Sequence, residues 1–281
     1  MKRRFVLAAA LVATPLCIGG LTDGAVANST QAAAAAPGAW QAKLTYAKSQ
    51  GSVTTYTGLR LSVVHLGKQV FNMPVKSALF PSGTPKGGGL KPSSVSFHDL
   101  DGDGTPELVL VLWTGGAHCC YLDQIFDFSH ELAHKTEIDF RDSGAKVTTV
   151  NSRVVLQSAD DRFDYAFTDY ADSASPVQVW QYRSGQLVDT TRSYTGLIVK
   201  DAAQWWSRYL STRTSKKDDD VRGILAAWAA DESLLGDGAS AKTRLLQIAA
   251  DGDLDHGYGA PKGTAYVASL WKFLGAHGYL R

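Results

Sequence analysis

The run ELVLVLW, residues 107–113, constrains the fold of this chain more than any other stretch. Leucines at positions 108, 110 and 112 alternate with Val109, Val111 and Trp113. Successive side chains of a strand point to opposite faces of its sheet, so an apolar residue at every step predicts a strand that is covered on both sides. The rest of the chain must therefore supply a layer of structure against each face of this strand.

Other strand-like runs surround this one, from about residue 43 to residue 198. Two apolar runs within 58–75 flank Gly67-Lys68, which is a hairpin signal, and DQIFDF, AKVTTV, RVVLQS and VQVWQY follow later. Short strands at this spacing predict an antiparallel meander, a sandwich or part of a propeller. A complete propeller is not expected, because the region holds only roughly three blade-sized units.

The pattern becomes helical from residue 199 to residue 281. The segment 201–214 is helical in composition, and 218–236 places Val221, Leu225 and Trp228 on one helical stripe that ends before a glycine. Further helices are predicted at 240–252 and 264–278. The sequence therefore predicts an α+β protein with a β region over 43–198 and a C-terminal helical bundle over 199–281.

The first 27 residues have the three zones of a secretory signal peptide. Basic residues at 2–4 precede an apolar core at 5–21, and Ala25-Val26-Ala27 is a small-x-small cleavage site. We therefore expect cleavage after Ala27 and a secreted, extracellular protein. The apolar core is short for a membrane span, and no later stretch reaches the ~20 apolar residues that a bilayer requires, so no integral membrane association is expected. The alanine-rich segment 28–42 is predicted to be a disordered lead-in.

The charge of the exported chain excludes one class of partner. Removal of residues 1–27 takes away three basic residues and one acidic residue, which changes the formal net charge from +1 to −1. A chain of nearly zero charge has no strong electrostatic attraction to nucleic acid or to anionic lipid. We therefore expect no nucleic-acid partner.

An acidic loop precedes the two-faced strand. Asp99, Asp101 and Asp103 occupy positions 1, 3 and 5 of a D-x-D-x-D-G pattern, and Glu107 stands at position 9. Calcium takes six to eight oxygen ligands, and alternate carboxylates on a tightly curved loop supply several of them. An EF-hand would have glutamate at position 12, where this chain has Leu110, and would continue into a helix. The pattern therefore favours a calcium site in a strand–loop–strand setting.

The segment DLDGDGTPELVLV resembles the calcium loop of FG-GAP/VCBS-type repeats, which occur in integrin α-chain propellers and in many secreted bacterial proteins. The resemblance implies that Asp99, Asp101, Asp103 and Glu107 contribute side-chain oxygens and that Thr105 contributes a backbone oxygen. The wider run, including GGAHCCY, is similar to uncharacterised secreted bacterial proteins that carry this loop. This wider similarity implies no catalytic mechanism.

Two adjacent cysteines follow the same strand. Cys17 leaves with the predicted signal, so the exported chain retains Cys119 and Cys120. Export favours disulfides, and here any intramolecular bond must join neighbours, which predicts a vicinal disulfide. Three other interpretations remain open at this point: a soft-metal site with His118, a cysteine nucleophile with His118 or His98 as its base, and two free thiols.

These features favour a secreted, calcium-binding protein that acts as a non-catalytic binding or structural module. Its partner would be an extracellular ligand, either a glycan or a protein. The sequence contains no G-x-S-x-G, HExxH or phosphate-loop motif. The alternative hypothesis is a secreted hydrolase that uses the calcium loop or the His118, Cys119 and Cys120 cluster as its centre.

Overall fold

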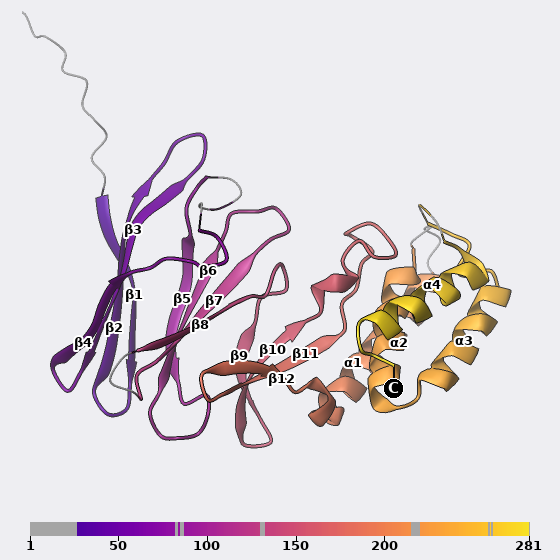
Figure 1. The fold of residues 1–281 in the computed structure, drawn as a ribbon. Coiled ribbons are helices and arrows are strands. Elements are labelled where there is room, and N and C mark those ends of the chain that lie inside the picture. The colour runs from indigo at the N-terminus through magenta and orange to yellow at the C-terminus, as the bar shows by residue number, and fades with distance from the viewer. Residues whose placement is uncertain are drawn as a thin grey trace, which may run out of the picture.

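The computed structural model describes residues 27–81, 84, 87–129, 133–214, 220–257, 259 and 261–280. The predicted signal segment up to residue 26 lies outside the described residues. Three antiparallel sheets of four strands each are followed by four α-helices, which confirms the predicted α+β class (Figure 1).

Each sheet is an antiparallel meander of consecutive strands. The first sheet contains β1 (Ala27–Ala36), β2 (Trp40–Ser49), β3 (Thr55–His65) and β4 (Lys68–Pro74). The second contains β5 (Lys91–His98), β6 (Glu107–Trp113), β7 (Tyr121–Asp127) and β8 (His134–Asp139). The third contains β9 (Lys146–Val150), β10 (Arg153–Ala159), β11 (Val177–Arg183) and β12 (Gln186–Asp189).

The strand β6 is buried on both faces, as its sequence predicts. Leu108, Leu110 and Leu112 lie in one apolar cluster with residues of the first sheet. Val109, on the opposite face, lies in a second cluster with Leu156 of the third sheet. The second sheet is therefore the middle layer, and the three sheets stand side by side in chain order (Figure 1).

Residues 28–42 differ from the disordered lead-in that their composition predicts. They form most of β1 and the beginning of β2, and the two strands pair from Ala27 with Lys48 to Ala36 with Trp40. Alanine is a weak strand former, so the local sequence does not indicate a strand here. The edge of β2 supplies a row of backbone hydrogen-bonding partners, and this tertiary context overrides the local preference.

The four helices are α1 (Thr195–Arg213), α2 (Arg222–Leu235), α3 (Gly238–Ala250) and α4 (Gly263–Ala276). The change from strand to helix precedes the predicted boundary at 198/199, because α1 already begins at Thr195. Ile198 of α1 packs with Val155 and Val179 of the third sheet, so the helical region continues the row of layers. Within the described ranges, none of the helices combines the length and the apolar character needed to cross a bilayer.

A pair of carboxyl groups lies where α1, α2 and the third sheet meet. Asp231 of α2 is fully buried, and neither of its carboxyl oxygens accepts a hydrogen bond from the described residues. Asp201 of α1 accepts hydrogen bonds from Val177 N at 2.8 Å and from Trp205 Nε1 at 3.0 Å. Burial, followed by the charge of Asp201, raises the pKa of Asp231 to about 10. Asp231 is therefore protonated at neutral pH.

This pair makes stability depend on pH, and we expect Asp231→Asn to stabilise the protein at pH 8. The folded state keeps the proton that the unfolded chain releases above about pH 4. The free energy of unfolding therefore falls by up to about 1.4 kcal/mol per pH unit as the pH rises towards 10. The asparagine side chain has an amide N–H that can donate a hydrogen bond to Asp201, and it has no group that titrates in this pH range. The thermal midpoint should rise at pH 8 and change little at pH 4.

Asp251→Asn is the matched control, because this carboxylate is exposed at the end of α3. A thermal midpoint of Asp231→Asn that is unchanged or lower at pH 8 would contradict a protonated Asp231.

Candidate metal centre

The acidic loop connects β5 to β6 and curls around its own carboxylates. Asp99 accepts hydrogen bonds from Gly102 N at 2.8 Å and from Gly104 N at 3.1 Å, one with each carboxylate oxygen. Both glycines have positive φ, 84° and 90°, a backbone conformation that side chains resist. The spacing of aspartate and glycine in the sequence therefore encodes the curvature of this loop directly.

Glu107 closes the loop from inside the protein. It is the first residue of β6, has no exposed surface and pairs in register with His98 of β5. Its Oε2 accepts a hydrogen bond from Leu100 N at 2.7 Å, whereas its Oε1 is buried and has no hydrogen-bond partner in the described part of the chain. Buried polar oxygens normally have a partner, so Oε1 points to a missing donor or cation.

Three of the predicted ligands converge. Carboxylate oxygens of Asp99, Asp101 and Glu107 all lie within 4.8 Å of one another. Asp103 lies outside this group, and its Oδ1 accepts a hydrogen bond from Thr105 N at 2.6 Å. The proposed ligand roles of Asp103 and of the Thr105 carbonyl therefore remain predictions.

Asp127 is a further acid whose charge acts on this group, and the sequence did not indicate it. Leu108 of β6 pairs with Phe126 of β7, so the next step of the ladder sets Glu107 opposite Asp127. Asp127 is nearly fully buried and accepts hydrogen bonds from Ser129 N and Oγ. Asp127 could be predicted to lie here only from the pairing register of β6 and β7, and no local sequence pattern indicates that register.

The electrostatics of the centre favour a cation. Burial, followed by the charges of Asp101 and Asp127, raises the pKa of Glu107 to about 8. Burial and neighbouring acids also raise the pKa of Asp101. Burial and then the charges of Asp127, Glu107 and Asp101 raise the pKa of Tyr182, in the third sheet, to about 12. Ionising these acids together is therefore costly in the protein without a cation, and a bound cation would offset that cost.

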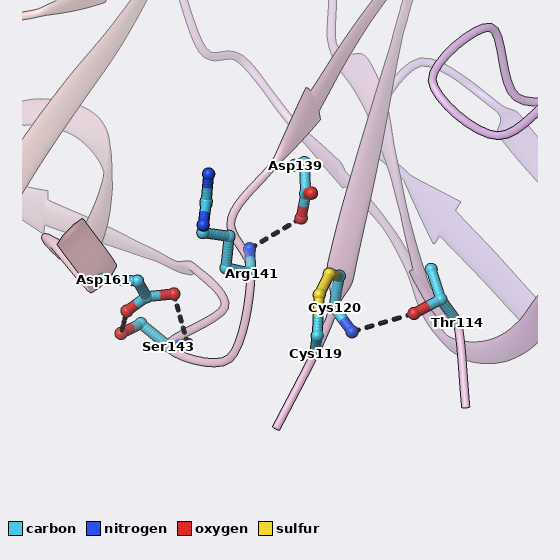
Figure 2. The surroundings of a disulfide bond; sticks show 7 residues. All are labelled: Thr114, Cys119, Cys120, Asp139, Arg141, Ser143 and Asp161. Atoms are coloured by element: carbon cyan, nitrogen blue, oxygen red, sulfur yellow. Dashed lines mark hydrogen bonds between the residues drawn. A yellow bond between two sulfur atoms is a disulfide. The ribbon is translucent and has the colours of Figure 1, made fainter. Parts of the chain in front are cut away.

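The turn after β6 holds the two cysteines, which form the predicted vicinal disulfide (Figure 2). Cys120 N donates a hydrogen bond to Thr114 Oγ1 at 2.9 Å, and Thr114 N donates to Cys120 O at 3.1 Å. Gly116 is required here, because a Cβ at this position would collide with the carbonyl oxygen of Cys119. The disulfide is therefore enclosed by a turn that is hydrogen-bonded across its base.

The disulfide argues against the alternative roles predicted for Cys119 and Cys120. A disulfide has no thiolate, so neither a nucleophile nor a thiolate metal site exists in this state. Asp139 has a carboxylate oxygen within 4.8 Å of both sulfurs and accepts a hydrogen bond from Arg141 N at 2.8 Å (Figure 2). The His118 ring contacts the ring of Tyr170, with centroids 3.8 Å apart.

One family match falls on the helical part. Residues 198–278 match the family described as the sll0997 C-terminal domain. The chain is 30% identical over 149 residues to the probable thylakoid lumen protein sll0997 of Synechocystis sp.. The aligned part covers 50% of this chain and 43% of that protein, so the chain spans less than half the length of this relative. No solved structure matches the chain. The acidic loop lies outside the segment that matches the family.

The disulfide can be tested on the chain that begins at Asn28. We expect its intact mass to be lower than that of the reduced chain by two hydrogen atoms. We also expect iodoacetamide to label neither cysteine under native conditions, because alkylation requires a thiolate. Reduction in denaturant should make both cysteines reactive, which serves as the control. Labelling of the native chain would contradict the disulfide.

Proposed function

We propose that this chain is an exported calcium-binding protein that acts as a non-catalytic binding or structural module. The observation that carries the proposal is the buried Oε1 of Glu107, which has no partner within the described residues and lies beside the carboxylates of Asp99 and Asp101. Three carboxylates gathered at one point suit a hard cation that prefers oxygen ligands. Asp127 adds a fourth negative charge from the neighbouring strand.

Calcium would act mainly on stability in this proposal. The group joins the loop, through Asp99 and Asp101, to Glu107 at the start of the central strand. A cation held there binds the folded chain and not the unfolded one, so it stabilises the fold by mass action. The charge on the cation also offsets the mutual repulsion of the acids.

Export is supported by the three-zone leader, by the vicinal disulfide and by the similarity to a protein named for the thylakoid lumen. Disulfides persist in oxidising compartments. The partner is proposed to be an extracellular ligand. The cysteine version of the hydrolase hypothesis loses its support, because the oxidised pair provides no thiolate.

The test is a calorimetric titration of the chelator-stripped chain from Asn28 with Ca²⁺, together with thermal melts. We expect one saturable site and a higher thermal midpoint, because a ligand present at 100 times its Kd adds about 2.7 kcal/mol to the free energy of unfolding. Glu107→Gln should lower the affinity for calcium by about tenfold or more, because the number of charged ligands tunes calcium affinity. The glutamine still accepts the hydrogen bond from Leu100 N, so the fold is preserved.

Asp251→Asn removes an exposed carboxylate from the helical region and should bind calcium like the unmodified chain. A correctly folded chain that shows neither binding heat nor a change in thermal midpoint would contradict the proposal.

A further inference from the structure

A cleft of about 670 Å³ opens directly beside the acidic loop, between the second and third sheets. Asp99 and Asp101 belong both to this cleft and to the group of converging carboxylates. The opposite wall comes from the turn between β9 and β10 and from the end of β11. It includes Arg153 and Arg183. The cleft is therefore lined by an acidic wall, from the loop, and by a basic wall, from the third sheet.

The two arginines are available to a ligand. Both are exposed, and among the described residues neither forms an ion pair. Arg183 donates a hydrogen bond to the side-chain oxygen of Gln181, and the amide nitrogen of Gln181 donates in turn to the hydroxyl of Tyr194. Gln181 and Tyr194 are buried. The guanidinium of Arg183 is thus held by the buried Gln181 at the edge of the cleft.

A cation in the acidic loop would change the charge on one side of this cleft. Calcium takes six to eight oxygens, and three converging carboxylates that contribute one oxygen each supply three of them. Since Asp99 and Asp101 line the cleft, a cation that they hold would border it and could accept a further ligand oxygen from that side. The bound cation would then attract an anionic group to this side of the cleft, and the two arginines could donate charged hydrogen bonds to the same group.

The remaining lining suits a hydroxyl-rich molecule. Side chains that donate or accept hydrogen bonds line the cleft between the charged groups: His98, Asn151, Ser152 and Gln181. A volume of this size lies in the range of binding sites for small ligands. Sugars combine many hydroxyl groups with, in acidic polysaccharides, a regularly spaced anion.

We propose that this cleft binds an acidic oligosaccharide, whose carboxylate or sulfate bridges the loop-bound calcium and Arg153 and Arg183. This inference rests on the calcium site proposed above and names the class of ligand for it. The cation and the arginines recognise the anionic group, and the neutral polar side chains recognise the hydroxyl groups.

The test is a calorimetric titration of the calcium-loaded chain from Asn28 with short oligogalacturonate. Parallel titrations use a short sulfated oligosaccharide, a neutral maltooligosaccharide and an acidic peptide. We expect binding of the oligogalacturonate or the sulfated sugar, loss of that binding in EDTA, and no binding of the neutral sugar or of the peptide. The preferred acidic sugar identifies the anionic group.

The double variant Arg153→Ala/Arg183→Ala should bind the acidic sugar about tenfold more weakly and still bind calcium normally, because neither arginine lies in the acidic loop. Lys43→Ala/Lys48→Ala removes two exposed cations from β2, in the first sheet, and should leave sugar binding unchanged.

Three results would overturn the inference while leaving the calcium site intact: calcium binding without acidic-sugar binding, sugar binding that persists in EDTA or in the arginine double variant, and equal or better binding of the neutral sugar or of the peptide. Failure of calcium to bind at all would overturn both proposals.

Discussion

The burial of β6 between two apolar clusters is the interaction on which the rest of the structure depends. Its leucines contact the first sheet and its valines contact the third, so this one strand joins three layers. The layers continue into the helices, where Ile198 packs on the third sheet. Disruption of β6 would therefore weaken both of the apolar clusters that join the three sheets.

Both functional features of the chain adjoin the ends of this strand. Glu107 is the first residue of β6, and its Oε1, at the candidate metal centre, has no hydrogen-bond partner within the described residues. Trp113 closes β6, and the turn that follows holds the Cys119–Cys120 disulfide. The strand is fixed on both faces and holds the backbone of Glu107 in place, and Leu100 N of the loop donates a hydrogen bond to its carboxylate. A loop built in this way can present carboxylates in a set position with a small loss of conformational entropy on binding.

The cleft depends on the arrangement of whole sheets. Its acidic wall belongs to the second sheet and its basic wall to the third, and the two meet because both sheets pack on the cluster around Val109 and Leu156. The buried carboxyl of Asp231 arises in the same way, where α2 meets α1. In both places, charged groups distant in sequence were brought together by packing of the apolar residues around them.

The sequence by itself determined the features that local chemistry encodes. The unbroken apolar run predicted a strand covered on both faces, the aspartates and glycines of 99–104 predicted a tight loop, and the helical stripes predicted the C-terminal region. Adjacent cysteines could bond only to each other within the exported chain. Only the tertiary structure decided that residues 27–36 form a strand, that Asp127 faces Glu107, and that Arg153 and Arg183 share a cleft with the acidic loop. These depend on strand register and sheet packing, which arise from contacts between distant segments and leave no pattern in any one of them.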